Sequence, residues 1–346
     1  MSKNSNKFKK IIAKKTLLVA EIGQAHEGSI NMAHSFIDLC ADKGIDAIKF
    51  QTHLADKEST YDEPFRIKFS YNDKTRYDYW KRMEFSISEW KELYKHCQRR
   101  NILFMSSVFS NEAFDLINKF DVCAWKLASG EIYSSELIDR MIKTKKPIIV
   151  STGVAKFSEL KKIVNYLKRK KAFFVLLQCT SNYPVKLENV GLNIMHEYKD
   201  KFKCPVGLSD HTGTIYPSIY TVSHGFSLIE FHVAFDRKMF GPDSSSSLDP
   251  NQIDELQKII ININRLRNNP INKDKVSNRI NRFKKIFGKS VALKKSLKKG
   301  HIIKKSDLTM KKPGNGISYE KIKNVLGKKL KKDVSHQYLL RPKDFN

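Results

Sequence analysis

Short apolar segments recur along the chain, and the stretch between each pair is long enough for one helix. Each segment is rich in β-branched and aromatic residues and becomes polar only where it ends, which is typical of a parallel strand buried on both faces. Eight such segments are present: LLVAEIG (17–23), IDAIKFQ (45–51), ILFMSSVF (102–109), CAWKLASGE (123–131), PIIVSTG (147–153), FFVLLQCT (173–180), PVGLSDH (205–211) and LIEFHVAF (228–235).

Amphipathic stretches separate these segments. Residues 31–44, 86–100, 156–170 and 251–267 carry apolar side chains three and four positions apart, the spacing of a helix with one buried face. Eight strand–helix units in about 250 residues predict the α/β fold of a (β/α)8 TIM barrel, whose pocket lies at the C-terminal ends of the strands. Polar residues collect at that rim: Glu21, Lys49, Gln51, Ser107, Lys126, Ser129, Glu131, Ser151, Tyr183, Ser209, His211 and His232.

The chain of 346 residues is longer than one barrel requires, and its composition changes after the eighth unit. We predict a basic N-terminal tail over 1–16, a barrel over 17–267, a polar linker over 268–286 broken by Pro270, and a small domain over 287–346. About 60 residues are near the lower limit for independent folding, so we expect the small domain to lean on another surface.

Basic residues outnumber acidic ones by 64 to 36, which gives a net charge of +28. Such a charge raises nucleic acid as a partner, but the lysines are scattered and no nucleic-acid-binding motif is present. A general lysine bias of the source proteome explains the same numbers, so we expect no nucleic-acid partner. The positive field would still draw anionic substrates toward a pocket.

The N-terminal residues lack the apolar core of a secretory signal, and no apolar run of about 18 residues occurs. The five cysteines fall within or beside the predicted barrel elements without paired spacing, as expected of reduced packing residues. These features predict a cytoplasmic protein without a membrane partner.

One strand end carries the groups of an anion site. The segment 123–131 places Lys126, Ser129 and Glu131 close together, and Lys49 adds a second cation from another strand. Ammonium and hydroxyl groups bind phosphate or carboxylate, while Glu131 offers a group for proton transfer. A strand-end lysine also occurs where it only extends its ammonium into solvent, but two that converge on one barrel mouth favour the anion site.

Two histidines end neighbouring strands. Adjacent parallel strands lie about 4.8 Å apart, so His211 and His232 at matching height could share one metal ion. A single histidine is more often a packing residue, but two at this rim, beside Asp210 and Asp243, favour a ligand pair completed by water or substrate oxygens. Such an open site suits a divalent Lewis acid, Mn, Mg, Co or Zn, and Mn and Mg are the ions we expect first.

The connection after the second strand segment, roughly from Thr52 to Phe85, is unusually long. Loops of this length within a compact domain are usually lids or partner-binding arms. Its many aromatic residues favour ordered packing over disorder.

The chain resembles the sialic acid synthase family in nine motifs: AEIGQAHEGS (20–29), IKFQT (48–52), KRMEFS (81–86), KLASGE (126–131), VSTG (150–153), CTSNYP (179–184), VGLSDHTG (206–213), the EFH strand (230–232) followed by GPDSSSSLDP (241–250), and KKPGNGIS (311–318). The resemblance runs from about Leu17 to the C-terminus. It implies a TIM barrel and a C-terminal antifreeze-like (SAF) domain, in a swapped homodimer in which each SAF domain covers the partner's barrel mouth.

The resemblance also implies an activity, namely the metal-assisted condensation of phosphoenolpyruvate with an N-acylated amino sugar, such as N-acetylmannosamine, to a nine-carbon sialic-type acid and phosphate. By position it implies phosphoenolpyruvate contacts at Lys49, Ser107, Lys126, Ser129, Ser151, Ser181 and Ser209; sugar contacts at Gln51, Tyr183, Asp243 and Lys312; proton handling by Glu131, with Glu21 next in line; and metal ligation by His211 and His232.

Four positions depart from the family's pattern. Ser107 stands where threonine is common, Ser181 where some members have asparagine, and Ser244 where histidine is frequent. Lys312 replaces the SAF-domain arginine that reaches into the partner's site, and lysine cannot make a planar two-pronged contact. No acid, base or metal ligand is lost, but the sugar is left open, and legionaminic- or pseudaminic-type acids are alternative products.

Two further functions remain as alternatives. A phosphoenolpyruvate-dependent aldol-type synthase acting on a sugar phosphate would need an additional arginine-rich phosphate site, and arginines are scarce at the predicted rim. A non-catalytic sugar-binding or nucleic-acid-associated protein would not need the full set of acid, cation and metal-ligand residues.

Overall fold

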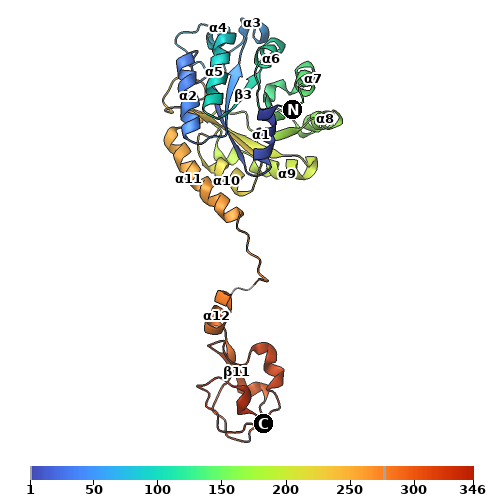
Figure 1. Ribbon diagram of the computed structural model, residues 1–346, viewed down its shortest axis with the longest axis vertical. Coiled ribbons are helices and arrows are strands. Elements are labelled where there is room, and N and C mark those ends of the chain that lie inside the picture. Colours follow the sequence, from blue (N-terminus) through green and yellow to red (C-terminus); the bar gives the residue numbers. More distant parts are fainter. Residues whose placement is uncertain (1, 276–277) are drawn as a thin grey trace. The chain divides into compact units, whose positions relative to one another are not determined.

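The computed structural model describes residues 2–275 and 278–346. The chain divides into two compact units between Asn269 and Pro270. In the first unit, eight parallel strands in sequence order form a closed barrel, since the first strand pairs with both the second and the eighth (Figure 1). The strands are β1 (Leu17–Gly23), β2 (Ala47–Thr52), β3 (Leu103–Val108), β4 (Trp125–Leu127), β5 (Ile148–Ser151), β6 (Phe174–Cys179), β7 (Val206–Asp210) and β8 (Leu228–Val233), and the short β9 (Ser247–Leu248) pairs with β8.

Helices connect consecutive strands and surround the barrel, which confirms the predicted TIM barrel (Figure 1). Their apolar faces pack on the outer face of the strands in the largest apolar cluster of the first unit. Burying these faces is the main stabilising contribution expected of such a fold. The helices are α2 (Ile30–Asp42), α5 (Ile87–Arg99), α6 (Asn111–Ile117), α7 (Ser135–Lys143), α8 (Phe157–Arg169), α9 (Leu192–Phe202), α10 (Tyr216–Ser223) and α11 (Pro250–Arg267).

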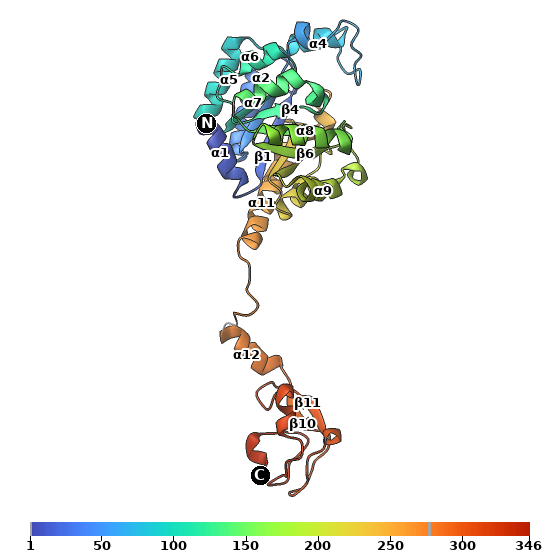
Figure 2. The same ribbon diagram turned by 90° about the vertical axis from the view of Figure 1, so that its right-hand side faces the viewer.

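The N-terminal segment differs from the predicted tail over 1–16, because its residues form helix α1 (Lys3–Ile12) beside β1 (Figure 2). The helix begins at Ser2, whose hydroxyl accepts a hydrogen bond from the backbone N–H of Ser5 (3.2 Å). Phe8 is fully buried and packs with apolar side chains from the N-terminal ends of the strands, such as Leu17 and Leu103. Removing this large aromatic ring from water holds a segment that its charge alone would leave in solvent.

The long connection between β2 and α5 contains α3 (Ala55–Glu58) and α4 (Arg76–Met83). Tyr79, Trp80 and Met83 of α4 are buried, and Phe65 and Phe69 pack against them. This aromatic cluster confirms that the connection packs in an ordered way.

The second unit contains α12 (Asn278–Phe287) and the antiparallel pair β10 (Ser290–Leu293) and β11 (Leu308–Lys311). Its core gathers mainly aliphatic side chains from strands and turns: Val291, Leu293, Leu297, Ile303, Leu308, Val325, Leu330, Val334, Leu340 and Phe345.

Helix α12 occupies most of the second half of the predicted linker over 268–286; residues 276 and 277 lie outside the described residues. Apolar side chains at Phe283, Ile286 and Phe287 have the three- and four-residue spacing of a helix face, and the segment lacks proline.

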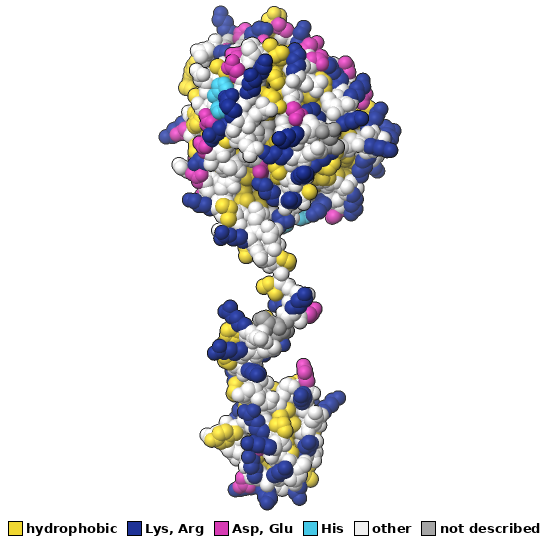
Figure 3. Space-filling model, viewed as in Figure 1, with side chains coloured by type: hydrophobic (Ala, Val, Ile, Leu, Met, Phe, Trp, Pro, Cys, Tyr) yellow, Lys and Arg dark blue, Asp and Glu magenta, His cyan; other side chains and the backbone are white. Residues whose placement is uncertain are grey.

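Basic side chains cover much of the visible surface of both units (Figure 3). In the part of the chain that the structure describes, no helix is long and apolar enough to cross a membrane.

Candidate active site

Four charged side chains from four strands meet inside the barrel, toward the C-terminal ends of the strands. The Lys49 ammonium lies 2.6 Å from Glu21 Oε2 and 3.7 Å from Glu230 Oε1, and the Lys126 ammonium lies 2.6 Å from that same Glu230 oxygen. Each of these side chains is at most 5% exposed. Because burying an unpaired charge costs several kcal/mol, we treat the four as one set, the charge cluster.

The strand pattern explains how these charges reach one place. The parallel register sets Glu21 of β1 beside Lys49 of β2 and beside His232 of β8. Residues two apart on a strand share a face, so Glu230 lies on the same face of β8 as His232. Lys126 comes from β4, on the far side of the barrel, and reaches β8 with its long side chain.

Hydroxyl and amide groups surround the charge cluster. Ser107 Oγ accepts a hydrogen bond from Lys49 (3.0 Å), and Ser209 Oγ donates one to Glu230 Oε1 (3.3 Å). Gln51 Nε2 donates to the carboxylate from β1 (2.5 Å). The structure therefore brings three more of the predicted site residues to the charge cluster.

The charge cluster sets the proton affinity of its own members. Burial alone would lower the pKa of Lys49, but the carboxylates of Glu21 and Glu230 outweigh it and raise that pKa. Burial lowers the pKa of Lys126, against the pull of Glu230. For Glu230, burial acts to raise the pKa, and the two ammonium groups overcome it and hold the pKa low. Glu230 is therefore ionised.

Buried oxygens at this end that lack a hydrogen-bond partner among the described residues include Glu230 Oε2 and Ser151 Oγ. Buried polar atoms are rarely left unpaired in native proteins, so such atoms mark places that a ligand or water completes. Nearby, the Ser129 and Ser181 hydroxyls lie 3.5 Å apart. A Cβ added to Gly153 would come within 2.3 Å of Ser181 Oγ, so a larger residue there would displace this hydroxyl.

The two predicted histidine ligands face each other beside Tyr183. The ring centroids of His211 and His232 are 5.3 Å apart, and Tyr183 stacks on His211 at 4.0 Å. His211 Nδ1 lies 2.9 Å from the Thr180 carbonyl oxygen, which can only accept, so Nδ1 carries the proton and Nε2 keeps its lone pair. Burial, followed by the nearby His232, lowers the pKa of His211 to about 3, and the imidazole is neutral.

A neutral imidazole with a free lone pair suits a divalent metal ion. Asp243 Oδ2 lies 3.8 Å from His232 Nδ1. Within residues 2–275 and 278–346, no group of three histidine, cysteine, aspartate or glutamate side chains is arranged to hold a metal. The histidine pair therefore fits a metal only in an open shell that water or substrate oxygens complete.

A cavity of about 260 Å³, the mouth cavity, opens above these groups. Arg66 from the long connection reaches across it and donates to Asp243 Oδ1 (2.6 Å) and to the Pro242 carbonyl (3.0 Å), with its guanidinium 4.1 Å from the centre of the Tyr183 ring. The lining comprises Gln24, Gln51, Phe65, Arg66, Ile67, Phe69, Arg76, Tyr79, Trp80, Phe109, Ala128, Ser129, Gly130, Tyr183, His232, Pro242 and Asp243. The connection predicted to be a lid or arm thus forms one wall of the site.

Two predicted site residues lie apart from the charge cluster. Glu131 is in the 3-10 turn after β4, where its Oε2 accepts a hydrogen bond from Ser134 (2.7 Å), and it is absent from the described lining of the mouth cavity. Lys312 belongs to the second unit, where it lines a separate cavity of about 420 Å³ with Arg341 and Asp344.

Sequence reasoning missed Glu230 and Arg66. Glu230 had a signal, because an acidic residue in the middle of an apolar strand segment, two positions before His232, is costly unless it is paired. No sequence signal pointed to Arg66, because its role depends on how the long connection folds back over Tyr183 and Asp243.

Each of the two units matches the model of a known protein family. The model of the NeuB family matches residues 36–272, and the model of the SAF domain matches residues 288–346. N,N'-diacetyllegionaminic acid synthase of Campylobacter jejuni is 36% identical over 334 residues, which cover 95% of this chain and 99% of the relative. Pseudaminic acid synthase of the same species is 32% identical, with 96% and 97% covered.

Among solved structures, the sialic acid synthetase of Leptospira borgpetersenii in complex with citrate superposes with a TM-score of 0.67 at 27% identity. The match covers 78% of this chain and 90% of that one.

Proposed function

The chain belongs to the NeuB family, and from that premise we propose that it condenses phosphoenolpyruvate with an N-acylated amino sugar, giving a nine-carbon sialic-type acid and phosphate. The observation that carries this proposal is the charge cluster, which places two buried ammonium groups among serine hydroxyls at the catalytic end of a TIM barrel. Several relatives are acid synthases by name, which supports an enzyme of this kind.

In this proposal Lys49 and Lys126 hold the phosphate and carboxylate of phosphoenolpyruvate through charge-assisted hydrogen bonds. The serine hydroxyls complete the site, and the unpaired Ser151 Oγ supports their role. The list of proposed contacts is Lys49, Ser107, Lys126, Ser129, Ser151, Ser181 and Ser209. Since the charge cluster sums to zero formal charge, Glu21 and Glu230 keep the two cations paired until the anion arrives.

The bonds change as follows. C3 of phosphoenolpyruvate forms a bond to the aldehyde carbon of the open-chain sugar, whose oxygen takes up a proton. C2 becomes cationic and bonds to a water oxygen, which releases a proton. The C2–O bond to phosphate then breaks while the C2 hydroxyl gives its remaining proton to the departing phosphate, and a keto acid remains. Glu131 and Glu21 are the proposed proton carriers, and the two lysines stabilise the phosphate and carboxylate throughout.

His211 and His232 are the proposed ligands of a divalent ion, Mn or Mg first, which when bound would polarise the sugar aldehyde. The neutral state of His211 and the lone pair on its Nε2, which lies 3.4 Å from Ser209 Oγ, support this assignment. The sugar lies in the mouth cavity in this proposal, against Gln51, Tyr183 and Asp243. Arg66 closes over it, because its present hydrogen bond to Asp243 spans that cavity.

We infer the sugar from the names of the relatives rather than from N-acetylmannosamine. The higher identity to N,N'-diacetyllegionaminic acid synthase favours a substrate with two acetamido groups over N-acetylmannosamine. The aromatic wall of the long connection also suits methyl and deoxy carbons better than hydroxyl groups. A pseudaminic-type product is the alternative.

A sugar phosphate is a second candidate substrate, because two arginines line the mouth cavity where the sequence had predicted few. Each already has a carboxylate partner: Arg66 pairs with Asp243 (2.6 Å) and Arg76 with Glu63 (3.3 Å). We place this candidate second, since both partners would have to be displaced for a phosphate to bind.

The test is phosphate release coupled to loss of phosphoenolpyruvate across a panel of sugars: N-acetylmannosamine, its 6-phosphate, and diacetamido trideoxyhexoses of either series. The proposal expects a diacetamido sugar to give the highest kcat/KM. Release without any sugar, or no release with any, would refute the condensation.

We further propose that the protein works as a swapped homodimer in which the second unit of one copy, with Lys312, covers the mouth cavity of the other. Sedimentation of the active protein tests this. A fully active monomer would contradict it. A cytoplasmic location and the absence of nucleic-acid partners remain predictions.

A further inference from the structure

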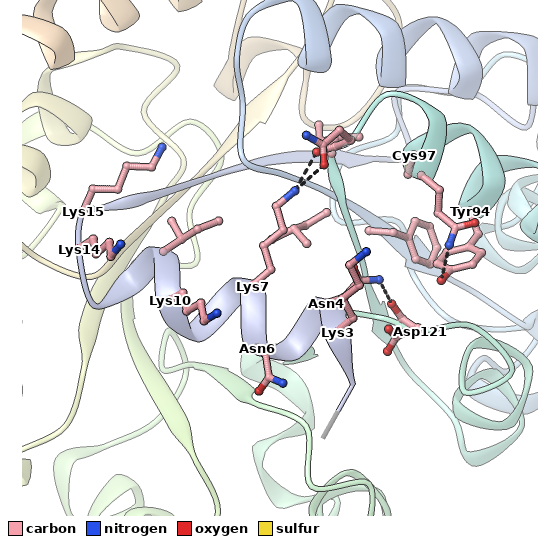
Figure 4. Close-up of a pocket in the computed structure, with 16 residues that line it drawn as sticks. Lys3, Asn4, Asn6, Lys7, Lys10, Lys14, Lys15, Tyr94, Cys97 and Asp121 are labelled. Atoms are coloured by element: carbon pink, nitrogen blue, oxygen red, sulfur yellow. Dashed lines mark hydrogen bonds between the residues drawn. The ribbon is translucent and has the colours of Figure 1, made fainter.

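A large cavity among the described residues lies away from the proposed catalytic end. It encloses about 1000 Å³ between α1, α5 and the start of β3, beside Leu103 at the N-terminal end of the barrel. Figure 4 shows α1 running along it, with several of its lysine side chains drawn. TIM-barrel chemistry occurs at the opposite end of the strands, so the reaction does not account for this cavity.

Four lysines form a stripe along the cavity. Lys3, Lys7, Lys10 and Lys14 are spaced four, three and four residues apart, which places them on one face of α1, and all four line the cavity. Lys9 of the same helix lies elsewhere, with its ammonium 4.5 Å from the centre of the Phe173 ring, and does not line it.

Most of these lysines have no structural partner. Lys7 donates to the Asn101 carbonyl (3.1 Å) and to its side-chain oxygen (2.8 Å), so it holds α1 against the end of α5. By contrast, the ammonium groups of Lys3, Lys10 and Lys14 make no hydrogen bond or ion pair with the residues that the structure describes. Their packing role in the fold is therefore small.

The acidic groups at the cavity are already engaged. Asp121 is the carboxylate in the described lining, and Lys146 binds it at 2.6 Å. Lys15, also in the lining, is paired with Asp46 at 2.7 Å. The net result is a concave surface with three uncompensated cations, which attracts an anion more strongly than a flat surface of equal charge.

The opposite wall is apolar and amide-rich. Ile102, Leu103 and Phe104 at the start of β3 and Tyr94 of α5 form an apolar wall, and Gln98 adds an amide beside it. A simple inorganic counterion would gain no favourable contact from an apolar wall. A ligand that matches both sides carries several negative charges at one end and a flat, largely apolar group with hydrogen-bonding edges at the other.

We propose that this cavity binds a nucleoside polyphosphate, with the phosphates at Lys10 and Lys14 and the base against Tyr94, the half-buried ring of the apolar wall. The enclosed volume is at the upper end of the usual range for small-molecule sites. The proposal is independent of the condensation reaction, because no residue of the cavity belongs to the charge cluster or lines the mouth cavity.

Calorimetric titration of the full-length protein with ATP, adenosine and tripolyphosphate tests the proposal. ATP should bind most tightly, since it alone offers both the charge and the base. In Lys10→Glu/Lys14→Glu its dissociation constant should rise about tenfold or more, because two charge-assisted contacts become repulsive. Neither lysine has a structural partner, so the thermal midpoint should change little.

Two matched controls separate a site from the general positive field. Lys161→Glu/Lys162→Glu on α8 makes the same change in net charge far along the sequence, and Lys9→Glu reverses a charge on α1 outside the cavity. Both should change ATP affinity less than about twofold at 0.15 M salt, where distant charges are screened. Equal weakening in the controls, tripolyphosphate binding as tightly as ATP, or no ATP binding would each overturn the proposal, as would an RNA oligonucleotide that displaces ATP at far lower concentration.

Discussion

The two ends of the barrel both carry lysines, in opposite states. At the C-terminal end Lys49 and Lys126 are buried and bound to glutamates at 2.6 Å. At the N-terminal end Lys10 and Lys14 are exposed and have no carboxylate partner among the described residues.

The difference shows what burial adds to charge. An exposed ammonium is solvated and screened by salt, so it contributes long-range attraction and little stability. A buried ammonium must be paired, and its proton affinity and position are then fixed by its partners. Only the second arrangement holds a reacting anion in one orientation, which is why we assign chemistry to the C-terminal end.

Chelation should produce the largest effect, and only at the C-terminal end. In our proposal a thorough chelator removes the ion held by His211 and His232, and turnover should fall to background and return when Mn or Mg is added. His211→Ala should weaken the activating ion by about 10-fold to 100-fold while the far-ultraviolet circular dichroism stays the same. Full activity in chelator would remove the metal from the account.

Breaking the charge cluster should have the next largest effect. Lys126→Met leaves Glu230 buried with one fewer cation, so the protein should lose about 3 kcal/mol of stability and at least about 10²-fold in kcat/KM. The double variant Lys126→Met/Glu230→Gln removes both charges and should regain most of the stability without the activity. Denaturant unfolding and phosphate release measure the two quantities.

If the double variant regained activity as well as stability, the ion pair would serve the fold alone. If Lys126→Met lost neither stability nor activity, the charge cluster would have no role in the fold or in the reaction.

The two candidate proton carriers can be separated within the same end. Glu131→Gln should lower kcat by about 10²-fold with little change in the KM for phosphoenolpyruvate, as expected on loss of a general acid or base. Glu21→Gln removes a partner of Lys49, so it should lower stability as well as rate. A Glu131→Gln enzyme that keeps its kcat and loses only sugar affinity would reassign proton transfer to Glu21.

Acid should act through a buried histidine after β1 rather than through the lysines. Burial lowers the pKa of His26 to about 3, and its Nδ1 accepts a hydrogen bond from the Gly28 N–H (3.1 Å), which requires the neutral ring. The unfolded chain protonates its histidines near pH 6.5. Stability is therefore complete above that pH and falls as the pH drops toward 3, since the unfolded state then binds the additional proton.

Measured by denaturant unfolding, the loss between pH 7 and pH 4 should be smaller in His26→Gln, by up to about 3 kcal/mol. Lys10→Gln, at the other barrel end, should keep the wild-type acid dependence. The same acid loss in His26→Gln and wild type would show that other groups cause it.

The sequence predicted the elements and the inward strand faces well, because periodicity and strand-end polarity are local signals. It placed Glu21, Lys49 and Lys126 on one rim, and the structure adds that Lys49 pairs with Glu21 while Lys126 pairs with Glu230. It missed the partner Glu230 and the arm residue Arg66, since pairing across a barrel and folding of a long connection are tertiary properties.

The dependence on tertiary contacts also explains why the sequence did not predict the N-terminal helix. Its lysines suggested a solvated tail, while the helix depends on Phe8 finding an apolar site at the N-terminal end of the barrel, 9 residues before the strand segment that helps to form it. Local charge predicted exposure correctly for the lysines and wrongly for the segment as a whole.

The most direct test compares lysine variants of the two ends in the same assay, phosphate release from phosphoenolpyruvate with the best sugar and no added nucleotide. Lys126→Met should lose about 10²-fold or more in kcat/KM, whereas Lys10→Glu/Lys14→Glu should stay within about twofold of wild type. Equal losses at the two ends, or full turnover by Lys126→Met, would contradict the assignment of chemistry to the buried charge cluster.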